Sequence, residues 1–187
     1  MFRTAFAALI IMTAPLFAAE VGDDGLHEAS WIEETFKDLR EDHEEATAQG
    51  KTLMVIIEQR GCIYCARMHE KVFPDPEITQ ALNDDFFVVQ INMFGDVEVT
   101  DLDGETMSEK DMVTRWNANF TPTLMFFPPD IAADLPANQA AVVTMPGAFG
   151  KWTTLNLLNW VSEAGYEGEE SFQRYHARIL QERGIVE

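Results

Sequence analysis

Three short apolar runs limit what this chain of 187 residues can fold into. They occupy residues 53–57, 86–91 and 124–127, and only Gln90 interrupts them. Runs this short and this uniformly apolar are typical of strands that are buried on both faces. A strand with one solvent-exposed face alternates polar and apolar residues instead. The runs therefore predict a sheet with helices on each side, to which residues 142–144 add a weaker fourth strand.

Helical periodicity accounts for much of the remaining chain. Apolar residues recur at helical spacing over residues 30–49, and Gly50 is suited to end that helix. Further helices are expected at residues 62–73, 76–83, 108–117, 152–164 and 171–183. This order predicts an α/β fold, a three-layer α/β/α sandwich with an N-terminal helix and a C-terminal helical extension.

Three segments fall outside these elements. Residues 20–30 resemble a flexible lead-in, and residues 95–106, with Asp103-Gly104 at the turn, predict an exposed hairpin. Residues 128–141 are expected to form a loop. The hairpin and the loop either select a partner, as long loops in compact domains often do, or are variable surface decoration.

The first 19 residues have the features of a secretory signal. Arg3 precedes an apolar run at residues 4–16, and small residues follow it, before acidic residues begin at Glu20. The run is too short to span a bilayer comfortably. An uncleaved anchor or a buried first helix is the alternative. Cleavage would leave residues 20–187 as one domain working outside the cytoplasm, where disulfides persist.

The composition excludes several classes of partner and site. With 13 basic and 32 acidic residues, the net charge is −19, which repels nucleic acid and anionic lipid surfaces. The two cysteines, Cys62 and Cys65, are too few for a disulfide framework or for an all-cysteine zinc site.

The two cysteines lie three residues apart, directly after the first apolar run and at the start of a helix. A structural disulfide closing so short a loop would contribute only about 2 kcal/mol. A metal site could add His69, but no fourth ligand is evident. The helix N-terminus favours a thiolate at Cys62, which makes it the expected nucleophile, and Cys65, one turn further in, would resolve the mixed disulfide.

This strand–Cys-x-x-Cys–helix unit is followed by Phe120-Thr121-Pro122-Thr123 before the third run, and the combination resembles the thioredoxin superfamily over about residues 31–164. In that family the Thr-Pro bond is cis and packs against the active-site disulfide. The resemblance implies that Thr121 and Pro122 present backbone to a substrate chain. Tyr64, between the cysteines, would shape the contact surface.

Residues 61–78 resemble, more narrowly, periplasmic thioredoxin-like proteins of bacterial disulfide reduction and sulfur oxidation. This resemblance implies a periplasmic reductase of a specific protein disulfide, supplied with electrons by a membrane donor or a thioredoxin-type reductant. We expect a monomer with no metal and no cofactor beyond the Cys62–Cys65 pair. An oxidase or isomerase, and a metal or cofactor-assembly module using the same cysteines, remain alternatives.

The sequence departs from ordinary thioredoxins around the cysteines. Gly61 replaces a tryptophan, and Ile56 occupies the position of a buried aspartate that accepts a proton from the second cysteine. Glu58 is the nearest acid and a candidate proton relay, the alternative being a solvated acid at a strand end. His69 is expected to be a solvated helix residue, with proton shuttling near Cys65 as the alternative.

Overall fold

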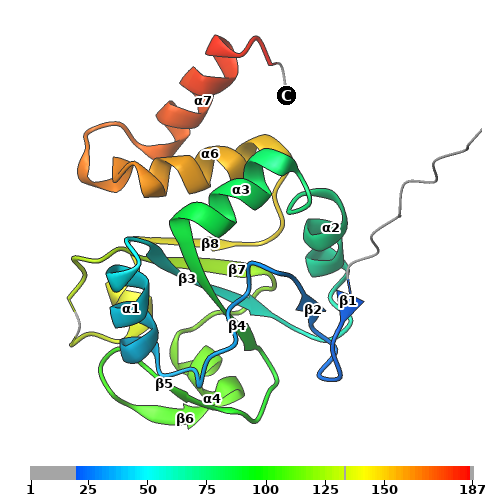
Figure 1. The fold of residues 1–187 in the computed structure, drawn as a ribbon, viewed down its shortest axis with the longest axis vertical. Helices are drawn as coiled ribbons and strands as arrows, with labels where there is room; N and C mark the ends of the chain where they lie inside the picture. Colours follow the sequence, from blue (N-terminus) through cyan, green and yellow to red (C-terminus); the bar gives the residue numbers. More distant parts are fainter. Residues whose placement is uncertain (1–19, 133, 186–187) are drawn as a thin grey trace, which may run out of the picture.

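A four-stranded sheet forms the centre of the protein, in the order β4-β3-β7-β8 (Figure 1). The computed structural model describes residues 20–132 and 134–185, so the expected signal at residues 1–19 lies outside it. The strands are β3 (Thr52–Glu58), β4 (Phe86–Asn92), β7 (Thr123–Phe127) and β8 (Val143–Pro146). β3 runs parallel to β4 and antiparallel to β7, which in turn pairs antiparallel with β8. All four predicted strands are confirmed.

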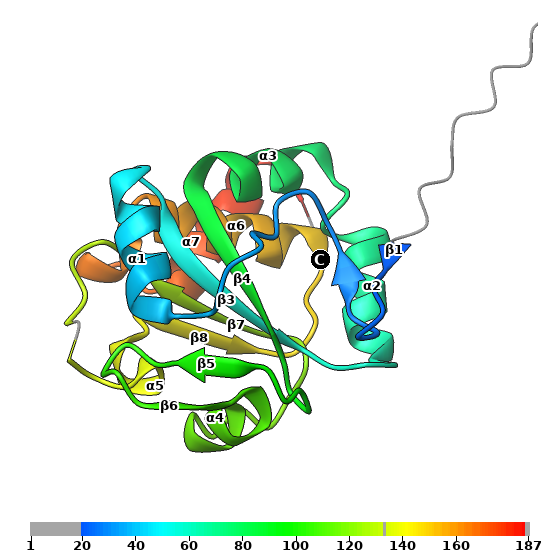
Figure 2. The same ribbon diagram turned by 60° about the horizontal axis from the view of Figure 1, so that its bottom comes forward.

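Helices cover both faces of this sheet, as an α/β sandwich requires (Figures 1 and 2). One face carries α2 (Ile63–Lys71), α3 (Pro76–Asp85) and α6 (Lys151–Ser162), with α7 (Phe172–Glu182) packed on α6 after the short 3-10 helix η1 (Gly165–Glu167). The other face carries α1 (Leu39–Ala48), α4 (Glu109–Arg115) and α5 (Ala137–Ala140). The predicted fold class is therefore confirmed. Within the described residues, no helix combines the length and the apolar character that crossing a membrane would need.

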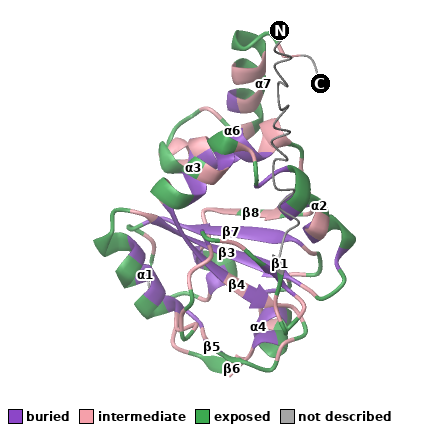
Figure 3. Cartoon of the chain, turned by 45° about the vertical axis from the view of Figure 1, so that its right-hand side comes forward, coloured by how far each residue is buried: buried purple, intermediate pink, exposed green. Residues whose placement is uncertain are grey.

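Two apolar clusters hold the layers together, one on each face of the sheet. Successive side chains of a strand point to opposite faces, so Met54 and Ile56 of β3 pack toward α2 and α3, while Leu53, Val55 and Ile57 pack toward α1 and α4. All seven residues of β3 are buried, and Figure 3 shows β3 and β7 as buried strands beside partly exposed helices, whereas the edge strand β8 is only partly buried. The apolar run at residues 53–57 is thus explained by cover on both faces.

The helix expected over residues 30–49 begins only at Leu39. The preceding segment runs alongside the sheet instead, where Ile32 forms a parallel bridge with Val88 of β4. Lys37 has a positive φ of 59°, which is incompatible with a continuing helix. Asp38 then starts α1, because its side chain accepts a hydrogen bond from the backbone N–H of Arg40. The expectation of a helix through residues 30–38 is therefore wrong.

Residues 20–30 also differ from the expected flexible lead-in. They form a hairpin of β1 (Glu20–Val21) and β2 (His27–Glu28) that lies against α2. Arg60 holds its turn by donating hydrogen bonds to the backbone carbonyls of Asp23 and Asp24, at 2.8 and 3.2 Å. Val21 consequently lines a hollow together with Cys62.

The two insertions are more ordered than their sequence suggests. The hairpin appears as β5 (Glu98–Thr100) and β6 (Thr106–Ser108), but Val99 is fully buried in the cluster beneath α1 and α4. The carboxylate of Asp101 is buried and accepts hydrogen bonds from the Arg115 guanidinium, the Trp116 indole N–H and the backbone N–H of Ala137. The predicted loop at residues 128–141 contains the short helix α5. These contacts fix both insertions to the core.

Asp42 in α1 generates a testable prediction about stability. Its side chain is buried, and that burial raises the pKa of the carboxyl to about 7. The unfolded chain releases this proton near pH 4, so stability is lost as the pH rises through the folded pKa. Asp42→Asn keeps an acceptor for the Thr35 hydroxyl, which donates to Asp42 at 3.2 Å. We compare the free energy of unfolding of the variant with that of the wild type, measured by urea denaturation at pH 5 and at pH 8. We expect this difference to favour the variant by about 1 kcal/mol more at pH 8 than at pH 5.

Glu41→Gln, at an exposed position of the same helix, is the matched control and should show no such pH-dependent gain. An equal effect of Asp42→Asn at both pH values would contradict the prediction.

Candidate functional site

The disulfide between Cys62 and Cys65 lies at the N-terminus of α2. Gly61, with a φ of 72°, turns the chain from β3 into this helix, and Cys62 is the N-cap residue. The backbone N–H of Cys65 donates a hydrogen bond to Cys62 Sγ at 3.0 Å. Such a donor stabilises a thiolate when the disulfide is reduced. Cys65 is fully buried and Cys62 is 6% exposed, in agreement with an outer attacking and an inner resolving cysteine.

The Thr121-Pro122 turn lies against Cys62. Its peptide bond is cis, and the Thr121 hydroxyl lies 3.3 Å from Cys62 Sγ. The Thr121 carbonyl oxygen is 3.7 Å from the same sulfur, and the Pro122 carbonyl accepts a hydrogen bond from Gly147. No backbone hydrogen bond within the described part of the chain engages Thr121. The structure thus brings Cys62, Cys65, Thr121 and Pro122 together and leaves the Thr121 backbone available beside the sulfur.

Apolar side chains surround the disulfide on the protein surface. Ile63 and Tyr64 are 74% and 56% exposed, and Phe120 on the opposite loop is 65% exposed. A groove of about 330 Å³ lies between them, with Cys62 and Thr121 in its wall. Sequence reasoning selected Tyr64 but missed Phe120. The position of Phe120 directly before Thr121-Pro122 is the signal that could have indicated its role.

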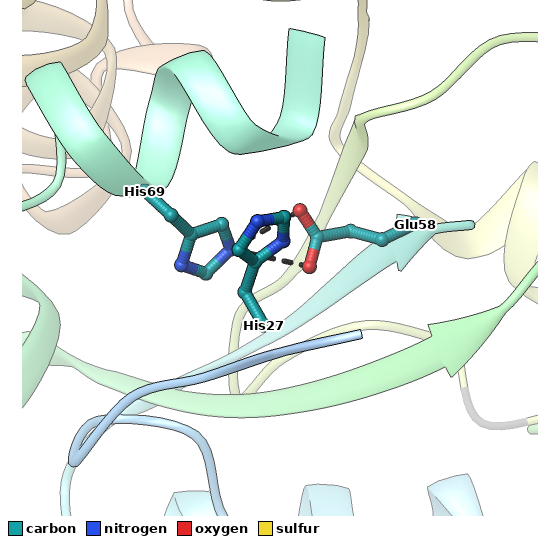
Figure 4. A group of neighbouring side chains, drawn as sticks. All are labelled: His27, Glu58 and His69. Carbon is teal, nitrogen blue, oxygen red and sulfur yellow. Dashed lines mark hydrogen bonds and ion pairs between the residues drawn. The ribbon is translucent and has the colours of Figure 1, made fainter. Parts of the chain in front are cut away.

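A buried polar cluster lies at the end of β3 (Figure 4). Glu58 is completely buried, and its two carboxylate oxygens lie 3.1 and 3.2 Å from Nε2 of His69 on α2. The side-chain amide of Gln90 on β4 donates a hydrogen bond to Glu58 Oε2 at 2.7 Å. His69 is only 5% exposed. The expectation of a solvated histidine is therefore wrong, and so is the solvated alternative for Glu58, because α2 and β4 cover the strand end.

His27 completes this cluster from β2. Its ring stacks on that of His69 with centroids 4.5 Å apart and planes within 11°, and the Trp31 ring is 5.7 Å from His69. Burial, followed by the nearby His69, lowers the pKa of His27. Sequence reasoning missed His27 because a two-residue strand gives no readable periodicity. His27, Glu58, His69 and Gln90 together form the histidine–glutamate cluster.

Comparison with known families identifies the domain. Residues 39–130 match a family model described as a thioredoxin-like domain. These residues belong to the thioredoxin superfamily. The family match begins at α1 and extends past β7, so it contains the cysteines, the Thr121-Pro122 turn and three of the four histidine–glutamate cluster residues. Among curated proteins, none matches the sequence significantly.

Solved structures share the thioredoxin fold with this chain. A thioredoxin from Thermus thermophilus is 23% identical, with a TM-score of 0.52, over 68% of this chain and 86% of that one. A thioredoxin-fold protein from Helicobacter pylori is 16% identical, with a TM-score of 0.51, over 69% and 80% of the two chains. The reduced C-terminal domain of Neisseria meningitidis DsbD also matches, at 11% identity and a TM-score of 0.44, over 63% and 88%. The similarities to the Thermus thermophilus and Helicobacter pylori proteins support the thioredoxin fold alone.

The thioredoxin-like domain therefore carries a Cys-x-x-Cys disulfide at a helix N-terminus, with a cis-proline turn against the outer sulfur. A thiolate formed there attacks a disulfide sulfur, and the second thiol resolves the mixed disulfide that results. The protein is a thiol–disulfide oxidoreductase of the thioredoxin type.

The Thr121 hydroxyl gives a prediction for the reduced protein. Thr121→Val keeps the shape of the side chain but removes the hydroxyl that lies 3.3 Å from Cys62 Sγ. A hydrogen bond to a charged group contributes about 1.5 kcal/mol or more, so we expect the pKa of the Cys62 thiol to rise by about 1. The pH dependence of iodoacetamide alkylation measures this pKa. Thr121→Ser retains the hydroxyl and is the matched control; equal pKa values in the two variants would contradict the prediction.

Proposed function

We propose that this protein is a periplasmic reductase that reduces a disulfide in a specific client protein. The observation that carries the proposal is the position of Cys62, which stands at the N-terminus of α2 and beside a groove with apolar walls. The signal-like features of residues 1–19 support the periplasmic location. The net charge of −19 favours a protein client over nucleic acid.

The groove supports an extended client segment as substrate. Ile63, Tyr64 and Phe120 offer apolar area on both sides of the disulfide. The backbone of Thr121 is free to pair with a strand of the client, since main-chain hydrogen bonds give affinity in this mode of recognition and side-chain contacts give specificity. Tyr64 and Pro122 would then contact the client on opposite sides of the reacting sulfur.

The reaction begins from the reduced protein. The Cys62 thiolate attacks one sulfur of the client disulfide, and the other client sulfur leaves as a thiolate that takes up a proton. Cys65 loses its proton and attacks Cys62 Sγ, which releases the second client thiol and forms the Cys62–Cys65 disulfide. The client gains two electrons, which a membrane donor or a thioredoxin-type reductant must return to the protein. No cofactor beyond the cysteine pair enters this sequence.

Glu58 and His69 are suited to accept the proton that Cys65 must lose. Cys65 and His69 are four residues apart on α2 and are both buried, which places them on one face of the helix, about 5–6 Å apart at Cβ. This separation suits transfer through one water molecule, and Nε2 of His69 contacts the Glu58 carboxylate. The pair would thus replace the aspartate whose position Ile56 occupies.

A trapping experiment tests the proposed function. In Cys65→Ala the first attack proceeds, but the resolving thiol is absent, so we expect the client to accumulate as a mixed disulfide with Cys62. The measurement is recovery of a disulfide-linked complex from periplasmic extract, followed by identification of the client by mass spectrometry. Cys62→Ala, which lacks the nucleophile, is the control and should capture nothing.

Insulin reduction and the reduction potential decide the direction of the reaction. A potential near −270 mV supports a reductase, whereas about −120 mV indicates an oxidant. Absence of a trapped client together with absence of insulin reduction by the wild-type protein would refute the proposal.

The proton relay yields a separate prediction. Glu58→Gln preserves the side-chain shape but removes the base, so we expect resolution of the Cys62 mixed disulfide to slow about ten-fold or more at neutral pH. Rapid-quench measurement of the release step between pH 5 and pH 9, in the presence of a chelator, reports this rate. Glu70→Gln makes the same change at an exposed position of α2 and should leave the rate unaltered. Equal release rates in the two variants would exclude Glu58 from the relay.

A further inference from the structure

We propose that His27, Glu58 and His69 bind a divalent transition-metal ion, for which we take zinc as the probe. Two imidazoles and one carboxylate are a donor set that zinc accepts in proteins, with a fourth position open to water or another ligand. The three residues come from β2, β3 and α2, and their ligand atoms all lie within 4.8 Å of one another. The site does not use the cysteines, so it is distinct from a metal module built on Cys62 and Cys65.

The Glu58–His69 contact already has the spacing of two metal ligands. Ligand atoms about 2.1 Å from a tetrahedral zinc ion are separated by about 3.4 Å from each other. His69 Nε2 and the Glu58 oxygens are 3.1 and 3.2 Å apart. The His27 ring is parallel to that of His69, so it must tilt before its in-plane lone pair points at a shared ion. β2 is only two residues long and pairs with β1 at the edge of the molecule, which allows such an adjustment.

His27 provides an independent indication of a missing ligand. Its side chain is 9% exposed, and its buried Nδ1 atom has no hydrogen-bond partner among the residues that the structure describes. An unsatisfied buried polar atom destabilises a fold, and most such atoms in proteins have a partner. A metal ion would supply one.

The charge at the site also favours a cation. Glu58 is completely buried, and within the described residues its only ion-pair partner is His69, with no lysine or arginine in contact. A buried carboxylate requires a compensating positive charge or a proton. Gln90 donates hydrogen bonds both to Glu58 Oε2 and to the backbone carbonyl of His27, at 2.7 and 3.0 Å. Gln90 thus orients the Glu58 carboxylate and holds the backbone of His27 in place. Residues that hydrogen-bond to metal ligands commonly have this role.

An ion can reach the cluster from solvent. A groove of about 840 Å³ is lined by His27, Trp31, His69 and Gln90 among others, so three residues of the histidine–glutamate cluster border a hollow in the surface. The rings of Trp31 and Phe73 lie 5.7 and 5.0 Å from that of His69 and give the site an apolar wall. Such a wall strengthens the electrostatic attraction between the carboxylate and a bound cation.

Calorimetric titration of zinc into the full, oxidised protein tests this proposal. A thiol assay first verifies that both cysteines are in the disulfide, so that sulfur cannot ligate the metal. We expect one zinc ion per chain. His27→Phe preserves the stacked ring but removes its nitrogens, and Glu58→Gln preserves the shape but removes the charge. We expect each of these two variants to weaken zinc affinity by about 100-fold or more. We expect Gln90→Leu to weaken it by about 10-fold. His176→Gln in α7, outside the cluster, should leave the affinity unchanged.

Two results would contradict the proposal of a metal site. One is the absence of saturable binding to the oxidised wild-type protein at zinc concentrations up to about 0.1 mM. The other is zinc affinity that is unaltered in both His27→Phe and Glu58→Gln. Circular dichroism establishes that the variants are folded, and the wild-type titration needs no variant. Insulin reduction and client trapping are measured separately, so failure of the metal site and failure of the proposed function can be distinguished.

Discussion

Burial of β3 on both faces is the constraint on which the rest of the structure depends. This strand pairs with β4 on one side and β7 on the other, and apolar clusters cover both of its faces. Its last residue, Glu58, is therefore still inside the protein, whereas Gly61, three residues later, is exposed at the turn into α2. The same strand end leads to Cys62 in the wall of the groove and holds the buried carboxylate of Glu58.

The position of that carboxylate follows from the two-residue period of a strand. Ile56 and Glu58 are two residues apart, so both side chains point to the face that α2 covers. Glu58 therefore lies on the same face of the sheet as Ile56. Its partner comes from the helix, because His69 lies one turn after Cys65 on the buried side of α2. Nucleophile, resolving thiol and histidine therefore share one helix.

Much of this architecture can be predicted from the sequence, because a short, uniformly apolar run is best explained by a strand that is buried on both faces. The strands, the cysteine pair and the Thr121-Pro122 turn follow from local patterns. The helix predicted over residues 30–38 failed for a different reason. Trp31 and Leu39 fall at helical spacing, yet they pack on opposite faces of the sheet, which one helical stripe cannot do. Local periodicity contains no information about which layer a side chain joins.

The histidine–glutamate cluster could not be predicted from the sequence for the same physical reason. His27, Glu58 and His69 are far apart in the sequence, and each is polar, so a pattern of hydropathy assigns each to solvent. Their burial depends on contacts between β2, the end of β3 and α2, which form only when the sheet is assembled. The residue types alone raised Glu58 and His69 as candidates, but tertiary contacts were needed to join them with His27.

The hairpin at the start of the described chain has a practical consequence. Figure 2 shows β1 and β2 beside α2. Val21 of β1 lines the same hollow as Cys62, and Arg60, which also lines that hollow, donates hydrogen bonds to the hairpin turn. A label placed on β1 would therefore lie beside the reacting sulfur. α7, by contrast, packs on α6, which places the other end of the chain on a different part of the molecule (Figure 1). Affinity handles, fluorophores and surface attachments belong after α7, where they leave the approach of a client open.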